Sequence, residues 1–331
     1  MNNFSIGTPV NLAPTGIASF AKCPICLDLH HTGADIAVLG APFDLAIQGR
    51  TGTRLGPRGI RTASTRFSYK PGGSYDPERD EMYLDTNRWT IVDCGDVDYV
   101  PGDLETTFQN LTQAVRLLTE QGTMPVILGG DHSVTYPAIL GMEAAGPFDI
   151  IHFDAHLDWT RSIGGQTRSN GSPMRNCAAL PYVGRIIHLG IRGIGSSGPA
   201  DFADARANGD QIHSVKETRA LGIERILEDL TPGGRVYLTF DIDGMDAACA
   251  PATGSPMFGG FLYDEVVEMF EAIAKHSQVI GMDMVEVAPP YDDAGDTTAY
   301  LAARLVSLTT LLSILTLPAV AVAAQWLAGA H

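Results

Sequence analysis

Three short motifs in this chain combine histidine and aspartate at spacings that could do chemistry. They are Gly129–Ser133 (GGDHS), Asp154–Asp158 (DAHLD) and Asp241–Asp246 (DIDGMD). Each follows an apolar run that is typical of a buried parallel strand. Ligands of open α/β sheets bind outside the carboxyl ends of the strands. We therefore expect the three motifs to converge on one site.

The spacing within these motifs predicts a two-metal centre. Alternate residues of a strand share a face, so Asp154 and His156 point the same way, as do Asp241 and Asp243. Carboxylates crowded together without cations repel each other, and most would be driven to take up protons. Two divalent ions about 3.5–4 Å apart, with shared carboxylates between them, remove that conflict. The predicted ligands are His132, Asp154, His156, Asp158, Asp241 and Asp243. A lone aspartate would more often cap a helix or form a salt bridge, but the three motifs together favour metal.

The rest of the chain reads as the scaffold for these motifs. Apolar runs predict strands at Asp35–Phe43, Trp89–Val97, Met124–Gly130, Phe148–Asp154, Arg185–Ile191, Gln211–Val215, Arg235–Asp241 and Val279–Val287. Helical stretches include Leu104–Gln121, Glu217–Asp229, Tyr263–His276 and Thr298–Leu315. Strands alternating with helices predict a three-layer α/β fold, in which helices cover both faces of one parallel, eight-stranded sheet.

The chain has no Pro/Gly-rich linker and no internal repeat, so we predict a single domain over residues 1–331. Residues 1–34 are expected to form an N-terminal loop segment, and 298–331 a helix followed by an apolar tail. The stretch Gln48–Tyr75 reads as a long ordered loop of the kind that is often functional. Pro318 and several hydroxyl residues interrupt the apolar run Leu305–Gly329, which favours a buried helix over a membrane span.

Composition narrows the class of partner and the compartment. A net charge of −16 argues against a nucleic-acid partner, which would require clustered Lys and Arg. Five scattered cysteines do not suggest a disulfide framework, so a cytoplasmic setting is expected. Cys23 and Cys26 form one CxxC pair, which we interpret as two loop thiols rather than a zinc or redox site. The N-terminus has neither the basic start nor the apolar core of a signal peptide.

The three metal motifs resemble the signatures of the ureohydrolases, the family of arginases, agmatinases and guanidinobutyrases. Similar segments cover nearly the whole chain in the agmatinase-like branch, among them Gly40–Asp44, Gly52–Pro57, Ala250–Pro256 and Asp283–Val287. The resemblance implies the eight-stranded fold, a homo-trimer or hexamer, and two Mn²⁺ or Ni²⁺ ions per chain. It implies hydrolysis of a C–N bond of a small guanidino compound, giving urea and an amine.

The resemblance also implies a role for each site residue. One ion would take His132, Asp154, Asp158 and Asp241, and the other Asp154, His156, Asp241 and Asp243, so Asp154 and Asp241 would bridge. A water activated between the ions would be the nucleophile, and Asp158 would hold and pass on its proton. Glu286 would pair with the guanidinium. Ser255 would hydrogen-bond the Glu286 carboxylate.

One position departs from the family pattern. Most agmatinase-like members carry a His-Gly pair after the second motif, and that His is thought to pass a proton to the leaving amine. This chain has Asn170-Gly171 there, and an amide has no titratable proton to give. Either another group protonates the leaving nitrogen, or Asn170 binds substrate instead. We therefore expect a small guanidine or a biguanide, such as guanidine or metformin, rather than agmatine.

Other polar and aromatic residues have more ordinary interpretations. Arg161, Arg168 and Arg175 could grip a substrate carboxylate, but pairing with acids at a subunit interface is favoured. His152 and His188 are expected to be core histidines. Trp89, Trp159 and Tyr291 could line a pocket, although packing roles are the more common.

Two other functions stay open. A deacetylase-type amidohydrolase on the same general fold would use a single zinc ion. A non-catalytic subunit would keep the fold within a mixed oligomer with a related chain. Metal content distinguishes the deacetylase-type enzyme from a ureohydrolase, because the former would bind one ion and the latter two. Release of urea from any guanidine would exclude the non-catalytic subunit.

Overall fold

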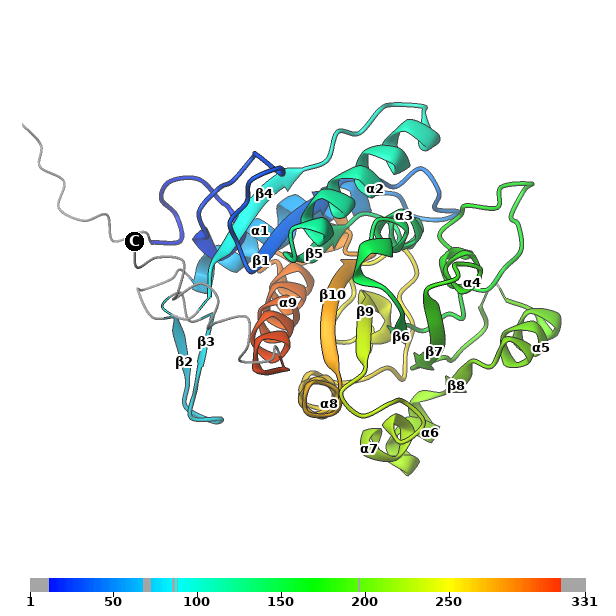
Figure 1. The fold of residues 1–331 in the computed structure, drawn as a ribbon. Coiled ribbons are helices and arrows are strands. Elements are labelled where there is room, and N and C mark those ends of the chain that lie inside the picture. The colour runs from blue at the N-terminus through cyan, green and yellow to red at the C-terminus, as the bar shows by residue number, and fades with distance from the viewer. Residues whose placement is uncertain (1–11, 68–72, 85–86, 88, 196, 317–331) are drawn as a thin grey trace, which may run out of the picture.

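In the computed structural model, eight strands form one sheet in which every neighbouring pair runs parallel (Figure 1). The structure describes residues 12–67, 73–84, 87, 89–195 and 197–316. The sheet order is β4-β1-β5-β10-β9-β6-β7-β8. The strands are β1 (Ile36–Ala41), β4 (Ile91–Asp96), β5 (Met124–Gly129), β6 (Phe148–Phe153), β7 (Val183–Leu189), β8 (Gln211–His213), β9 (Arg235–Asp241) and β10 (Gln278–Val285). The predicted eight-stranded parallel sheet is confirmed.

Helices cover both faces of this sheet and bury an apolar cluster on each (Figure 1). One layer contains α1 (Gly56–Ser64), α6 (Val215–Leu221), α7 (Ile223–Leu227), α8 (Tyr263–His276) and α9 (Thr297–Thr316). The other contains α2 (Leu104–Glu120), α3 (Thr135–Leu140), α4 (Pro173–Ala178) and α5 (Pro199–Asn208). Because both faces are covered, the central strands are continuously apolar; all six residues of β1 are buried. The three-layer prediction is also confirmed.

Three boundaries differ from the prediction. The stretch Gln48–Tyr75 is not one loop, because it contains α1, whose first turn includes Pro57; proline is compatible with a helix start. The predicted helix Glu217–Asp229 is two helices, separated at Gly222, whose φ of +80° breaks the helical geometry. The strand at Gln211 is short because Ser214 caps α6. A separate hairpin, β2 (Ser74–Asp76) with β3 (Glu81–Tyr83), was not predicted.

Between residue 12 and β1 the structure has one short 3₁₀ helix, Phe20–Lys22, and the described part of the chain ends with the long helix α9. Cys23 packs in the hydrophobic core and Cys26 is partly exposed. Neither cysteine belongs to a group of metal-ligand side chains in the described part of the chain. The predicted C-terminal helix is α9, and the apolar tail beyond it lies outside the described residues. No helix in the described ranges is long and apolar enough to cross a membrane.

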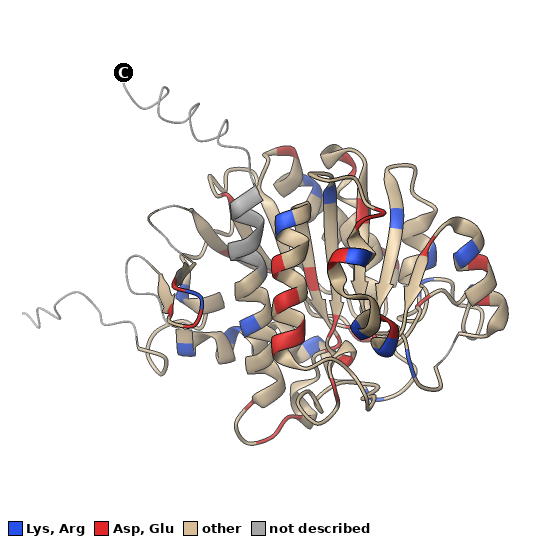
Figure 2. Ribbon diagram, turned by 90° about the horizontal axis from the view of Figure 1, so that it is seen from below, with Lys and Arg blue, Asp and Glu red and all other residues tan. Residues whose placement is uncertain are grey.

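Charged residues are distributed unevenly over the ribbon. Figure 2 shows Lys and Arg spread over separate elements, while acidic residues gather on α8, which carries Asp264, Glu265, Glu268 and Glu271. This distribution agrees with the net charge of −16.

Candidate metal centre

The three predicted motifs lie at the carboxyl ends of three central strands. GGDHS begins at the last residue of β5, DAHLD follows β6 directly, and DIDGMD begins at the last residue of β9. The sheet order places β5, β10, β9 and β6 side by side, so the motifs meet although more than a hundred residues separate the first from the last. Glycine is required where β5 ends, because a Cβ on Gly130 would lie 1.8 Å from the carbonyl oxygen of Phe43.

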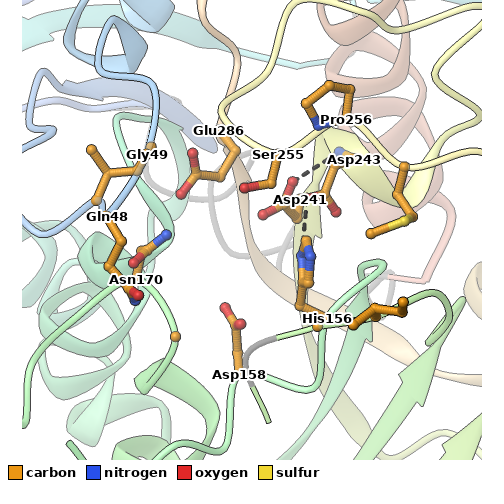
Figure 3. Close-up of a pocket in the computed structure, with 15 residues that line it drawn as sticks. Gln48, Gly49, His156, Asp158, Asn170, Asp241, Asp243, Ser255, Pro256 and Glu286 are labelled. Atoms are coloured by element: carbon orange, nitrogen blue, oxygen red, sulfur yellow. Dashed lines mark hydrogen bonds and ion pairs between the residues drawn. The ribbon is translucent and has the colours of Figure 1, made fainter. Parts of the chain in front are cut away.

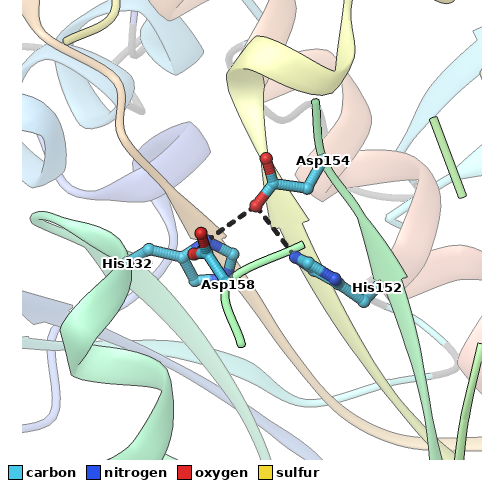
Figure 4. A group of neighbouring side chains, drawn as sticks. All are labelled: His132, His152, Asp154 and Asp158. Atoms are coloured by element: carbon cyan, nitrogen blue, oxygen red, sulfur yellow. Dashed lines mark hydrogen bonds and ion pairs between the residues drawn. The ribbon is translucent and has the colours of Figure 1, made fainter. Parts of the chain in front are cut away.

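The first ligand group surrounds the Nδ1 atom of His132. This atom lies 3.1 Å from Asp154 Oδ2 and 3.0 Å from Asp158 Oδ2 (Figure 4). It also lies 3.3 Å from Asp241 Oδ2. His132 is 1% exposed, yet its Nδ1 makes no hydrogen bond of ordinary geometry. A buried nitrogen that faces three carboxylate oxygens without a hydrogen bond is the arrangement of a metal ligand. Four of the predicted ligands therefore converge here.

The second group surrounds the Nδ1 atom of His156. It lies 3.1 Å from Asp243 Oδ2 and 3.4 Å from Asp154 Oδ1. Asp154 thus turns one oxygen to each group, which is the geometry that a bridging carboxylate requires. Asp241 faces the first group with Oδ2, while its Oδ1 accepts the backbone N–H of Asp243 at 2.8 Å.

Burial and mutual repulsion make this cluster costly without cations. Burial, with the neighbouring Asp154 carboxylate, raises the pKa of Asp158 to about 6. Burial and the Asp243 and Asp154 charges raise the pKa of Asp241 well above its usual range. The pKa of Asp154 is instead held well below its usual range, because hydrogen bonds from histidines outweigh the effect of burial. Carboxylate oxygens with two imidazole nitrogens suit Mn²⁺ or Ni²⁺ better than a closed zinc site, so the donor set fits two divalent ions.

Two of the predicted functional residues have unusual backbone geometry. Asp158 has φ +52° and Glu286 has φ +62°, in the left-handed region that side chains other than glycine rarely adopt. Such a conformation costs roughly 1–3 kcal/mol and is concentrated at functional sites. Both residues come directly after a sheet strand or the turn that follows it, where the geometry turns their carboxylates toward the cluster.

Glu286 is held in place by the strand that carries His132. Its Oε1 accepts the backbone N–H of His132 at 2.9 Å, and its own N–H donates to the carbonyl of Gly130 at 2.9 Å. The family resemblance predicts that Ser255 hydrogen-bonds this carboxylate. The structure instead gives that role to the His132 amide, and the Ser255 hydroxyl makes no described hydrogen bond to Glu286.

A cavity of about 340 Å³ opens beside the ligands (Figure 3). Asp158, Glu286, Asn170 and Ser255 all line it, so the structure brings together the residues predicted to meet substrate. The Oδ1 atom of Asn170 is buried and has no hydrogen-bond partner in the described part of the chain. A bound molecule that donates to this oxygen would supply the missing partner. The cavity is lined by Ile47, Gln48, Gly49, His156, Asp158, Asn170, Gly171, Ile194, Gly195, Asp241, Asp243, Ser255, Pro256, Met257 and Glu286.

The arginines considered for substrate binding lie elsewhere. Arg168 pairs with Glu105, and Arg175 pairs with Asp204. Because these partners belong to the same chain, Arg168 and Arg175 are already paired without a subunit interface. None of the three arginines lines the cavity, and neither do Trp89, Trp159 or Tyr291.

Several supporting residues were not identified from the sequence. The Thr239 hydroxyl lies 3.0 Å from His132 Nε2 and donates to Asp283 Oδ1 at 2.6 Å. These contacts fix the imidazole ring through Nε2, the nitrogen that does not face the carboxylates. Asp131 accepts the N–H groups of Ala46 and Ser133, at 3.0 Å each, and so links the first motif to the cavity wall. The sequence feature that could have identified these supporting residues is the presence of polar Thr239 and Asp283 inside otherwise apolar strands.

A family model described as the arginase family matches residues 34–311. The chain belongs to the arginase family. It is 32% identical to the human mitochondrial guanidino acid hydrolase over 300 residues, which cover 88% of this chain and 82% of the relative. It is 32% identical to the guanidinobutyrase of Pseudomonas aeruginosa, with 90% and 92% covered. The structure of proclavaminate amidino hydrolase from Streptomyces clavuligerus superposes with a TM-score of 0.78 at 26% identity, covering 92% and 99%.

Membership of the arginase family confirms the predicted class of enzyme. The chain is a ureohydrolase of the agmatinase-like branch, a hydrolase of C–N bonds in linear amidines. The arginase family is one of binuclear metal enzymes, and this chain carries the corresponding His/Asp cluster. A deacetylase-type amidohydrolase is therefore no longer needed as an alternative.

Proposed function

We propose that this ureohydrolase acts on a small guanidino compound with an uncharged tail, such as guanidine itself or a biguanide such as metformin. The products would be urea, or a urea analogue, and ammonia or an amine. The observation that supports this choice is the chemistry of the cavity wall.

Outside the metal ligands and Glu286, every described lining residue of the cavity is uncharged. The ammonium of agmatine would find no carboxylate on that wall, and the carboxylate of a guanidino acid would find no Arg or Lys. Ile47, Ile194 and Met257 offer apolar surface instead, which suits hydrogen or methyl substituents. A charged tail would lose water there without gaining a partner.

Glu286 is positioned to bind the guanidinium. Because its Oε1 is occupied by the His132 amide, Oε2 is the oxygen available to substrate. Burial, with the charge of Asp131, raises the pKa of Glu286 well above its usual range; a guanidinium ion would favour the charged carboxylate and form a charge-assisted hydrogen bond. This contact orients the guanidinium carbon toward the ligand cluster.

The remaining roles follow from position. His132, Asp154, His156, Asp158, Asp241 and Asp243 would hold two ions, Mn²⁺ or Ni²⁺, with Asp154 and Asp241 between them. When bound, the ions would supply Lewis-acid activation of a water molecule. Asp158, at the cavity floor, would accept the proton of that water and deliver it to the leaving nitrogen. Asn170 would accept a substrate N–H, and Ser255 would contact the substrate rather than Glu286.

The test is a panel of substrates assayed for urea or ammonia with Mn²⁺ and then with Ni²⁺. Guanidine and biguanides are expected to be hydrolysed faster than agmatine or 4-guanidinobutyrate. Turnover of the two charged substrates, with guanidine and biguanides inert, would refute the substrate assignment but leave the enzyme class intact. No release from any guanidine would favour a non-catalytic subunit of a mixed oligomer. We propose a homo-trimer or hexamer on the strength of the family resemblance, and a cytoplasmic setting on the strength of the scattered cysteines.

A further inference from the structure

A line of buried polar groups leads away from the metal centre across three strands. His152 Nε2 lies 2.9 Å from Asp154 Oδ2 (Figure 4), and His152 Nδ1 lies 2.8 Å from His188 Nδ1. His188 Nε2 lies 3.2 Å from Asp210 Oδ2. The two histidines are a cross-strand pair of β6 and β7, and Asp210 directly precedes β8. Both histidines are fully buried, and Asp210 is 7% exposed.

We propose that His188 and Asp210 are positioning residues for the metal centre. Acting through His152, they fix the orientation of the Asp154 carboxylate, so that one oxygen faces each ligand group. This inference rests on the proposed two-metal site and adds residues that lie outside its set of ligands.

The donors and acceptors along this line determine which hydrogen bond the Asp154 carboxylate accepts. Asp154, as an ionised metal ligand, can only accept, so His152 Nε2 must carry the hydrogen that joins them. His152 Nδ1 then needs His188 as its partner, whichever of the two nitrogens holds the shared hydrogen. Asp210 in turn holds the ring of His188, and its other oxygen accepts from Asn208 Nδ2 at 2.9 Å. Each group is fixed by the next one outward.

The second oxygen of Asp154 is fixed separately. Its Oδ1 accepts the backbone N–H of His156 at 2.6 Å. One donor on each oxygen sets the plane of the carboxylate, and that plane decides whether Oδ2 faces His132 while Oδ1 faces His156. Without the His152 donor, the carboxylate could turn and leave one ion short of a ligand. Hydrogen bonds to ligating carboxylates commonly support metal affinity in this way.

The experiment compares His188→Leu, which removes the partner of His152, with His188→Gln, which keeps a hydrogen-bonding group. Mn²⁺ is titrated calorimetrically into the full-length, chelator-stripped protein, and melting of the metal-free protein is recorded in parallel. We expect His188→Leu to weaken Mn²⁺ binding at least about tenfold, His188→Gln to recover much of the affinity, and Asp210→Asn to lose less than His188→Leu. His213→Leu, on the neighbouring strand β8 and outside the line, should bind Mn²⁺ as the parent does.

Unchanged Mn²⁺ affinity in His188→Leu would overturn the proposal. The proposal would also be overturned if His188→Leu and His188→Gln lost the same amount of Mn²⁺ affinity and both lowered the melting temperature of the metal-free protein. That pattern marks a purely structural role. If His188→Leu does not fold, Asp210→Asn and His188→Gln decide the matter, and parental affinity in both overturns the proposal. If the parent itself binds no Mn²⁺ and no Ni²⁺, the proposed metal centre fails instead.

Discussion

The carboxylate of Glu286 accepts the backbone N–H of His132 at 2.9 Å, which ties the proposed guanidinium-binding group to a proposed metal ligand. Glu286→Gln separates the two functions. The amide oxygen can still accept from His132, but the charge that pairs with the guanidinium is lost. We expect kcat/KM for guanidine to fall about 100-fold or more, while metal content stays at the parental level.

Elemental analysis and steady-state kinetics of the same preparation measure both effects. Glu268→Gln, on the exposed side of α8, is the matched control. If Glu286→Gln lost metal together with activity, Glu286 would support the ligands rather than bind the substrate.

His156 is the imidazole of the second ligand group, facing Asp243 and Asp154. His156→Asn is expected to lower the metal content from about two ions per chain to about one and to abolish most activity. The reason is that the first group keeps its own imidazole, His132. Metal content is counted by elemental mass spectrometry after gel filtration, with exposed His31→Asn as the control. Retention of both ions would show that His156 is not a ligand.

Ile194 lies at the mouth of the cavity and is 99% exposed, so a charge placed there should leave stability nearly unchanged. Ile194→Asp should improve kcat/KM for agmatine, and Ile194→Arg should improve it for 4-guanidinobutyrate. Each variant should disfavour the other substrate, because like charges then meet. Identical substrate preferences in the two variants would show that the substrate tails do not reach the cavity wall at Ile194.

Asn170 is the position where the chain lacks the histidine of most agmatinase-like relatives. Asn170→His adds a group that can protonate a poor leaving amine, so activity should shift toward longer guanidinoalkyl substrates. The ratio of kcat/KM for agmatine to that for guanidine measures the shift, with Asn170→Gln as the control without a titratable group. An unchanged ratio would remove the argument that this position selects the substrate.

The pKa of Asp158 predicts how metal binding depends on pH. Burial and Asp154 raise this pKa from 3.8 to about 6, so the metal-free protein holds a proton there below pH 6, which a metal ion must displace. Apparent affinity should therefore fall as pH drops below 6, by about tenfold per pH unit for each displaced proton, and level off above 7 for this group.

The stability of the metal-free protein should also depend on Asp158, but this contribution should decrease as pH rises, whereas metal affinity increases. A carboxyl whose pKa is raised on folding stabilises the metal-free protein below pH 3.8, and that contribution is lost as pH rises through 6. The rise in melting temperature caused by Mn²⁺ should therefore grow between pH 5 and 7. Scanning calorimetry with and without Mn²⁺ tests both statements, and an affinity independent of pH over this range would contradict them.

The sequence was sufficient for the elements whose signals are local. The strands could be predicted because apolar runs end in Gly or Asp. The convergence of the proposed ligands could be predicted because they lie at or just after the ends of those runs. The helix α1 was missed because its Gly- and Pro-rich start resembles a loop. The interruption at Gly222 was missed because one glycine inside a helical pattern often permits continuation.

The supporting contacts of the site depend on tertiary structure. His188 and Asp210 lie far from Asp154 in sequence, and only the pairing of β6 with β7, and of β7 with β8, aligns them. The expectation that Ser255 fixes Glu286 failed because a backbone amide does so, and backbone donors leave no trace in residue types. The prediction that His152 and His188 are core histidines is confirmed by their burial, although their hydrogen bonds reach Asp154.

The position of β10 has a consequence for how the protein is made. Within the described residues this strand is the last along the sequence, yet it pairs with β5 on one side and β9 on the other. Before it inserts, the sheet exists as two separate parts, one carrying His132 and the other carrying Asp154 and Asp241. A growing chain on the ribosome therefore cannot assemble the complete ligand set until its C-terminal region has emerged. We therefore expect loading of the proposed metal centre to follow the pairing of β10, and this long-range pairing is expected to make folding slow.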